Sequence, residues 1–376
     1  MRFRSWSVRV RLREGQVPAD YARAAEQLAH AWRVHAVRVT ASSPGRVRLL
    51  ATRTDPLVRV DIAPGAGELL AVRVGLLETG QPRVIDFRVV PHWLNAGATK
   101  SGKSNLANAI ITALAPQPVA LIRLDLKGGV EFTPYAPRLS ALATTRAESC
   151  RLLDDLTQLL TARMDLCRQY GARDIWRLPG HLRPAPVVVL VDEVAELFLI
   201  ADKSEKERAA RTATGLLRVA QLGRAFGVYL VVSGQRIGSD LGLGITALRA
   251  QLSGRVCHRV NDPETATMTL GDLDAARAIP AATPGVAIVA GQSGSWHGLA
   301  TVSAIRPDEP LTWEPPSEPR RSYRTAEPCQ ACGQPLIAGP RGTWRACVHL
   351  VVPPAVSVPY ARGPGRTAAS NPPEPL

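Results

Sequence analysis

The chain has 376 residues, of which 45% are hydrophobic and 21% charged. This length allows two or three domains, and this composition can bury a core, which excludes a wholly disordered protein. The formal net charge of +14 favours polyanionic partners, nucleic acid first and an acidic membrane surface second. Nearly all of that charge is arginine, which a GC-rich genome also produces, so the charge supports DNA binding without establishing it.

The sequence shows no sign of export or of membrane insertion. The basic segment Met1–Arg13 is not followed by the apolar run of a signal peptide. The most apolar window, Val187–Ala201, is interrupted by Asp192, Glu193 and Glu196, so no segment is expected to span a membrane. Cys150, Cys167 and Cys257 stand singly, as small core residues do. We therefore expect a cytoplasmic protein, with peripheral membrane association as an alternative.

Residues 1–75 are expected to form a small α+β domain. Phe3–Leu12 alternates apolar and polar residues as a strand does, and Pro18 opens a helix that continues to about Trp32. Val37–Thr40 and Val47–Thr52 predict two more strands, joined by a turn.

Residues 76–305 are expected to form an α/β domain. Short apolar runs alternate with helical stretches, among them a helix over 148–170; the runs are Val119–Leu126, Val187–Val191, Val228–Ser233, Val256–Val260 and Val286–Val289. Such alternation predicts a mainly parallel sheet covered on both faces. The chain then continues as a Pro-rich linker (306–328), a candidate zinc ribbon (329–350) and a tail (351–376) whose composition predicts disorder.

A complete Walker A motif, G-x-x-x-x-G-K-S, occupies Gly97-Ala98-Thr99-Lys100-Ser101-Gly102-Lys103-Ser104. Its glycines let backbone N–H groups point at phosphate oxygens, Lys103 places a charge on the β- and γ-phosphates, and Ser104 offers a hydroxyl to Mg²⁺. A helix from Asn105 to about Leu114 would add its positive end. The strand that should precede the loop is expected at Val84–Val90. ATP and Mg²⁺ are the cofactors that this motif indicates.

Two acidic residues, Asp192 and Glu193, follow the apolar run Val187–Val191. With a Walker A motif upstream, this pattern indicates a Walker B strand, in which Asp192 holds Mg²⁺ and Glu193 orients or deprotonates the attacking water. Gln235 follows the next apolar run and is a candidate γ-phosphate sensor, although an ordinary turn would also explain it.

Residues 90–290 resemble the motor domain of the FtsK/SpoIIIE family, and most of all the TraB-like conjugation translocases of mycelial bacteria. Five stretches carry the resemblance in the family's order: Ala96–Ser104, Asp125–Glu131, Val191–Leu197, Gly223–Val228 leading to Gln235-Arg236, and Ile245–Val256. The N-terminal unit resembles the small domain that precedes the motor in some TraB-like chains. Three residues depart from the family pattern: Lys100 replaces Gly, and Leu126 and Ser253 each replace Pro.

The resemblance implies a RecA-like P-loop ATPase that assembles as a ring, expected to be a hexamer, around double-stranded DNA. It also implies an arginine that reaches the neighbouring subunit's γ-phosphate; Arg224 is the first candidate and Arg255 the second. Arg236, Arg249 and Arg255 are candidates for contact with DNA phosphates, although each could equally be a solvated surface charge.

Near the end of the sequence, Cys329-x-x-Cys332 is followed by Cys347-x-His349. Four ligands of this type would close a tetrahedral structural zinc site, and a metal would explain how so small a segment folds. Two incidental cysteines in a loose tail are the alternative.

Taken together, these features predict an ATP-driven translocase of double-stranded DNA. Transfer of a mobile element between cells is the preferred role and movement of chromosomal or plasmid DNA the second, with membrane-associated or mobile-element proteins as further partners. An ATP-gated DNA-binding or coupling protein without processive movement, and a protein-secretion ATPase of the same superfamily, are the alternatives.

Overall fold

The computed structural model describes residues 5–302, apart from 58–64, 128–134, 137, 199–201, 236, 239–241, 243, 272–278, 280–283 and 291–295, together with 337–338 and 344–345.

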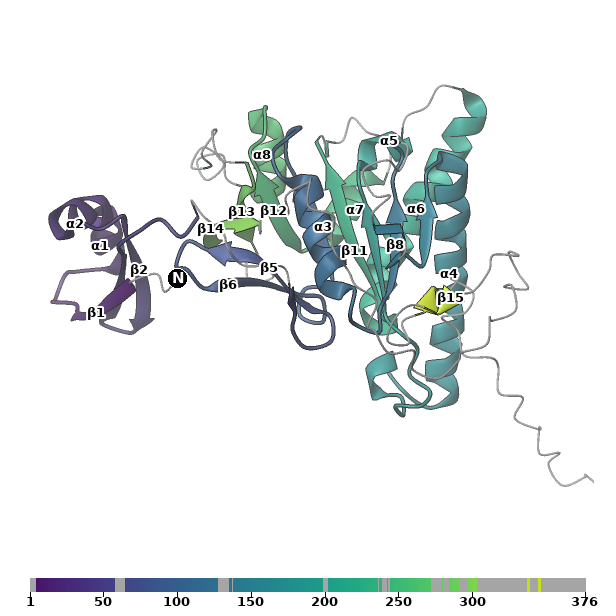
Figure 1. The fold of residues 1–376 in the computed structure, drawn as a ribbon, viewed down its shortest axis with the longest axis horizontal. Coiled ribbons are helices and arrows are strands. Elements are labelled where there is room, and N and C mark those ends of the chain that lie inside the picture. The colour runs from purple at the N-terminus through teal and green to yellow at the C-terminus, as the bar shows by residue number, and fades with distance from the viewer. Residues whose placement is uncertain are drawn as a thin grey trace, which may run out of the picture.

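The first unit is a three-stranded antiparallel sheet with two helices. Its elements are β1 (Ser5–Arg11), α1 (Pro18–Arg23), α2 (Ala25–Trp32), β2 (Ala36–Ser43) and β3 (Arg46–Thr52), and the strand order is β1-β3-β2. The strands and helices expected for a small α+β unit are present, but the single helix expected from Pro18 is two short helices that meet at Ala24. The helices lie together on one side of the strands (Figure 1), and Trp32 of α2 stacks on Trp6 of β1 with ring centroids 4.9 Å apart.

The second unit is built on a sheet of eleven strands within the described residues, in the order β4-β5-β14-β13-β12-β7-β11-β10-β8-β9, with β6 beside β5. The strands are β4 (Gly65–Ala66), β5 (Ala71–Leu77), β6 (Pro82–Asp86), β7 (His92–Ala96), β8 (Ala120–Leu124), β9 (Ala141–Ala143), β10 (Val187–Val191), β11 (Val228–Gly234), β12 (Gly254–His258), β13 (Val286–Ala290) and β14 (Trp296–Val302). All pairings from β12 to β9 are parallel, and those from β12 to β4 are antiparallel. The mainly parallel sheet is thus confirmed. Strand β5 extends across the domain boundary that we expect after residue 75.

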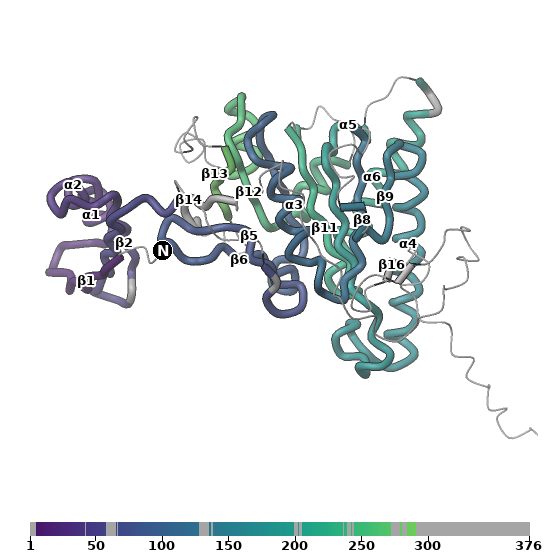
Figure 2. The backbone as a smooth tube through the Cα atoms, in the orientation of Figure 1, coloured from purple at the N-terminus to yellow at the C-terminus, as the bar shows by residue number. Residues whose placement is uncertain are grey.

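Helices cover both faces of this sheet, as the alternation of runs predicts. The helices are α3 (Lys103–Leu114), α4 (Arg146–Gln169), α5 (Val194–Phe198), α6 (Lys203–Phe226), α7 (Ile245–Gln251) and α8 (Pro263–Leu270), with a short 3-10 turn at Ile175–Arg177. Alternate residues of β10 divide between two cores: Val188 and Leu190 pack with α3, whereas Val187, Val189 and Val191 pack with α4 to α7. The two long helices α4 and α6 run side by side at one end of the molecule (Figures 1 and 2).

The strand that leads into the Walker A loop is β7, not the segment Val84–Val90 that the sequence suggests. Val84 belongs to β6, an antiparallel strand, and is 45% exposed. The chain turns at the end of β6, where the Asp86 side chain accepts the backbone N–H of Arg88 at 2.9 Å. Strand β7 is wholly buried at the centre of the sheet, but His92 and Asn95 interrupt its apolar pattern and conceal it in the sequence.

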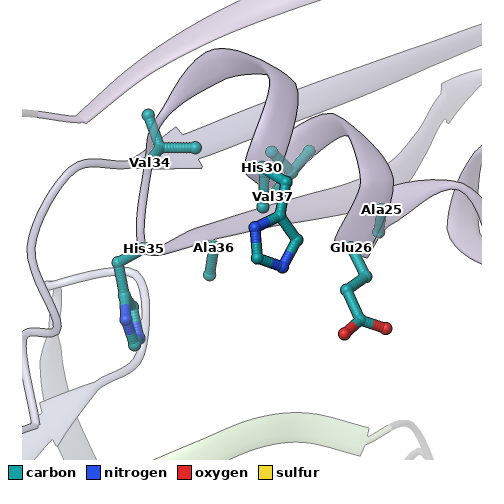
Figure 3. A pocket seen from close by; sticks show the side chains of 8 residues that line it. Ala25, Glu26, His30, Val34, His35, Ala36 and Val37 are labelled. Carbon is teal, nitrogen blue, oxygen red and sulfur yellow. The ribbon is translucent and has the colours of Figure 1, made fainter.

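Membrane spans, metal clusters and pockets can be assessed only for the described residues. No helix among them is long and apolar enough to cross a membrane, and they contain no cluster of three or more side chains suited to a metal ion. A pocket beside α2 is lined by residues between Ala25 and Val37; Glu26, His30 and His35 stand apart around it (Figure 3). Strands β15 (Ile337–Ala338) and β16 (Trp344–Arg345) pair antiparallel. The expected linker, the tail and the four expected zinc ligands lie outside the described residues.

Candidate nucleotide-binding site

The Walker A loop connects the carboxyl end of β7 to the start of α3. Its first two residues are fixed by the strands on either side of β7: Gly97 N–H donates to the carbonyl of Gly234, the last residue of β11, at 3.3 Å, and Ala98 N–H donates to the carbonyl of Arg259, just after β12, at 2.8 Å. Ser104 and Asn105 lie in the first turn of α3, where backbone N–H groups have no acceptor within the helix. The expected strand–loop–helix context of the motif is therefore present.

Both motif glycines occupy positions that have no room for a side chain. Gly102 has φ of 119°, and a Cβ there would lie 2.8 Å from the Cα of Gly285. A Cβ on Gly97 would lie 2.5 Å from the Ser101 hydroxyl oxygen and 2.7 Å from Cβ of His258. The loop is thus packed closely against the ends of β12 and β13, and its shape depends on glycine at both positions.

Lys100, which stands where the related family has glycine, adopts φ of 60°. This is the left-handed region, which costs a residue with a Cβ about 1–2 kcal/mol. Its side chain is exposed, so no packing contact requires lysine there. The family's glycine is explained by the backbone, and lysine is tolerated at the cost of local strain.

The Lys103 side chain is folded onto its own loop. It is 7% exposed, and its ammonium group donates to the carbonyl of Ala98 at 3.0 Å and also to that of Gly97. A phosphate group in the loop would have to replace these carbonyls as the acceptor. The ammonium is therefore already held at the centre of the loop, which suits it to bind an anion there.

Asp192 and Glu193, at the carboxyl end of β10, lie beside two basic residues of the neighbouring strand β8 and the loop after it. Asp192 Oδ1 accepts from Arg123 Nη2 at 3.0 Å, and both side chains are almost wholly buried. Lys127 Nζ lies 3.6 Å from Asp192 Oδ2 and 3.6 Å from Glu193 Oε2. The two carboxylates are therefore oriented by basic side chains at the carboxyl ends of the parallel strands, where the loop also lies.

Gln235 connects the Walker B acids with the Walker A loop. Its backbone N–H donates to Glu193 Oε1 at 3.1 Å, and its side-chain oxygen accepts from the Thr99 hydroxyl at 3.1 Å. Glu193 Oε2 is buried and has no hydrogen-bond partner among the described residues, although Lys127 is near it. Gln235 is thus hydrogen-bonded both to Glu193 and to Thr99.

Two buried polar residues, which the sequence analysis did not identify, lie against the Walker A loop. Asn95 Nδ2 donates to the carbonyl of Lys103 at 3.1 Å and to the Ser233 hydroxyl at 3.0 Å, which ties β7 to α3 and β11. His258, at the end of β12, lies under Gly97 and Gly102 and is wholly buried. Its burial, and secondarily the charge of Lys103, lower its pKa to about 3, so it is neutral at physiological pH.

The structure describes three of the four candidate arginines. Arg224 is exposed in the last turn of α6, shortly before the amino end of β11, whereas the loop lies at the carboxyl ends of the strands. Arg249 donates to the carbonyl of Ile237 at 3.0 Å, and Arg255 to that of Arg249 at 2.8 Å. Burial, and then the charge of Arg249, lower the pKa of Arg255. Arg236 lies outside the described residues.

A mainly parallel sheet with helices on both faces, a glycine-bounded loop that joins β7 to α3, and a pair of acids at the end of β10, two strands from β7, define a P-loop ATPase fold. Comparison with known proteins gives the family. The FtsK/SpoIIIE family model matches residues 66–184 and 177–239, and the Actinomycete conjugal transfer protein N-terminal domain matches residues 3–53. The chain belongs to the FtsK/SpoIIIE family of ATPases.

Individual relatives agree with this assignment. Transfer protein TraSA of Streptomyces ambofaciens is 45% identical over 307 residues, which cover 77% of this chain and 74% of TraSA. DNA translocase SftA of Bacillus subtilis is 33% identical over 207 residues, which cover 51% of this chain and 21% of SftA. The structure of the pCW3 conjugation coupling protein TcpA with ATPγS has a TM-score of 0.59 at 21% identity, over 80% of this chain and 85% of TcpA. At that identity the likeness to TcpA supports the fold alone.

Proposed function

We propose that this protein hydrolyses ATP to move double-stranded DNA during conjugative transfer. The observation that carries the proposal is the convergence of Lys103, Glu193 and Gln235 at one edge of the sheet in a chain 45% identical to a transfer protein. A DNA translocase among the relatives supports DNA as the substrate.

In this proposal each site residue has one task. The loop from Gly97 to Ser104, with Asn105 behind it, would cradle the phosphates through backbone N–H groups, and Lys103 would exchange its loop carbonyls for phosphate oxygens. Glu193 would accept the proton of the attacking water, because its Oε2 has no hydrogen-bond donor of its own. Gln235 would couple nucleotide binding in the loop to the position of Glu193, because it is hydrogen-bonded to both Thr99 and Glu193.

The residues present also fit Mg²⁺. The Ser104 hydroxyl and the Asp192 carboxylate are hard oxygen donors, which this ion prefers, and both stand beside the loop. When bound, the ion would neutralise charge on the phosphates. Arg123 and Lys127 would hold the Asp192 carboxylate in position for it.

We further propose that the protein acts as a ring, with six subunits as the expected number and DNA in the channel. Arg224 cannot serve this chain's own loop from the amino end of β11, so it would act only on a neighbouring subunit. Arg255 is the second candidate. Arg236 and Arg249 would then face DNA, and Arg249 would have to release the Ile237 carbonyl to do so.

DNA-stimulated ATP hydrolysis by the purified protein tests the site. Lys103→Ala should abolish nucleotide binding, whereas Glu193→Gln should bind ATP normally and hydrolyse it slowly, because the phosphate cradle stays intact. Lys206→Ala, an exposed lysine of α6, and Glu196→Gln, an acid one helix turn beyond Glu193, are the matched controls and should leave the rate unchanged. Wild-type turnover by Glu193→Gln would refute the Walker B assignment.

The alternatives give different results in the same experiment. A static DNA-binding or coupling protein would bind DNA without ATP-dependent movement along it. A protein-secretion ATPase would be stimulated by a protein substrate and not by DNA.

A further inference from the structure

The face of the N-terminal sheet that points away from α1 and α2 is strongly basic. Side chains alternate across a strand, and Trp6, Val8 and Val10 of β1 lie on the helix side with the buried residues of β3. The opposite side therefore carries Arg9 and Arg11 of β1 and Arg46 and Arg48 of β3. We call these four exposed arginines the basic face.

The register places these arginines in direct cross-strand pairs. Arg9 lies opposite Arg48, and Arg11 lies opposite Arg46. Like charges opposite each other destabilise a sheet, so the arrangement works against the domain's own stability. Among the described residues, Arg9, Arg11 and Arg48 form no ion pair, and strands β1 to β3 contain no acidic residue.

In the described part of the chain, the acids of α1 and α2, and Asp55 after β3, have no ion pair with Arg9, Arg11 or Arg48; Asp55 lies 3.7 Å from His35. Asp20 on α1 is bonded to Arg23 and to the Val17 N–H, and Glu26 lies at the pocket beside α2 on the other side of the sheet. Glu14 follows β1 in the turn towards α1. A cluster in which like charges face each other across two strands suits a polyanionic ligand, which would reduce the repulsion.

We propose that the basic face binds the phosphate backbone of double-stranded DNA, outside any channel formed by the ATPase sheet. This proposal rests on the proposed function, which brings DNA to the protein. Guanidinium groups bind phosphate through two parallel hydrogen bonds, and alternate residues on adjacent strands stand roughly 5–7 Å apart, a spacing that allows contact with several phosphates. The exposed hydroxyl of Ser7 lies on the same side and adds an uncharged donor.

The composition of the basic face favours DNA over an acidic lipid surface. Proteins that lie on membranes insert aromatic or aliphatic side chains beside their basic residues. Here Trp6 and Val8 are on the opposite side of β1, where Trp6 stacks on Trp32. On the side of the basic face, Leu50 is partly buried and lies opposite Ser7, and none of the strand residues there is aromatic, so this side offers charge without an exposed apolar wedge.

The basic face adjoins the ATPase domain. Arg38 of β2, on the same side of the sheet as the four arginines, forms an ion pair with Glu78 in the turn between β5 and β6. DNA held by the basic face would stay close to the ATPase sheet, which raises its effective concentration there.

Salt-dependent DNA binding by the full chain tests the proposal. The double variant Arg9→Gln/Arg48→Gln should bind a 40-base-pair duplex of mixed sequence roughly 60-fold more weakly at about 0.1 M salt, because each lost phosphate contact costs about 8-fold there. The slope of log affinity against log salt should fall in magnitude by about two. Fluorescence anisotropy measures both quantities.

Two further measurements separate this role from a structural one. The melting temperature of the double variant should be unchanged or higher, because a like-charge pair has been removed. Arg23→Gln/Arg168→Gln changes the net charge equally at two exposed helical arginines and should keep the wild-type slope. Equal slopes for all three proteins, or a lower melting temperature in the Arg9/Arg48 variant, would overturn the proposal.

The test also resolves the competing outcomes. Unchanged DNA binding with lost binding to vesicles containing 30% phosphatidylserine would refute DNA and assign the basic face to membranes. At saturating DNA the double variant should hydrolyse ATP at the wild-type rate. If DNA does not stimulate the wild-type protein, the proposed function fails, while the anisotropy slopes still decide whether the basic face binds DNA.

Discussion

Replacing Arg123 by Met should destabilise the protein strongly, because it leaves Asp192 buried without its main partner. Arg123 is 0% exposed and Asp192 3% exposed, and their side chains are 3.0 Å apart. Removing one member of a buried ion pair costs about 3–5 kcal/mol. Lys127, 3.6 Å from the other carboxylate oxygen and half exposed, should recover only part of this.

Urea unfolding of a double-mutant cycle isolates the pair. Arg123→Met/Asp192→Asn removes both charges, so it should lose less stability than the sum of the two single variants, with a coupling of about 2 kcal/mol or more. Arg211→Met, which breaks an exposed pair with Asp154, is the matched control and should cost less than about 1 kcal/mol. Additive losses in the Arg123/Asp192 cycle would show that the pair is not coupled and would refute its role in holding Asp192.

Three further predictions follow from particular residues. Lys100→Gly should be about 0.5–1 kcal/mol more stable than Lys100→Ala in urea unfolding, because only glycine relieves the φ of 60°; the reverse order would contradict the strain. Burial lowers the pKa of His92 to about 4 and that of His258 to about 3, so below pH 6.5 the unfolded chain takes up protons that the folded chain does not. The unfolding free energy should therefore fall by about 2–3 kcal/mol per histidine between about pH 6.5 and 4.5, and His258→Gln should remove one share; identical pH slopes would exclude this. Metal analysis should find about one zinc per chain, bound by Cys329, Cys332, Cys347 and His349; metal-free protein prepared without chelator, in which both Cys329 and Cys332 react freely with thiol reagents, would rule the site out.

The sequence predicts those parts of the structure that depend on local patterns. The apolar run Val187–Val191 and its two acids form β10 and its carboxyl edge, and the motif from Gly97 to Ser104 joins a strand to a helix. The leucines of the 148–170 segment face the core on α4. In each case the local pattern of apolar residues indicates the type of element without any long-range contact.

Features that depend on long-range register could not be predicted in the same way. Strand β7 was missed because its polar residues have distant partners: Asn95 meets Ser233, and His92 Nδ1 accepts the backbone N–H of Leu230. Arg123 was an unexplained charge in an apolar run, which signals a buried partner. Its partner is Asp192. The sequence does not identify this partner, because it depends on the pairing of β8 with β10, which places Arg123 opposite Leu190. The like-charge pairs of the basic face likewise appear only once β1 and β3 are in register.

The account's central claim is that ATP hydrolysis at this site moves the protein along double-stranded DNA. Displacement of a short third strand from a duplex tests it most directly, because a moving protein strips the strand and a static one does not. We predict displacement by the wild-type protein with ATP, and none by Glu193→Gln, which still binds ATP and DNA. Wild-type protein that hydrolyses ATP in the presence of DNA but leaves the third strand in place would contradict the claim.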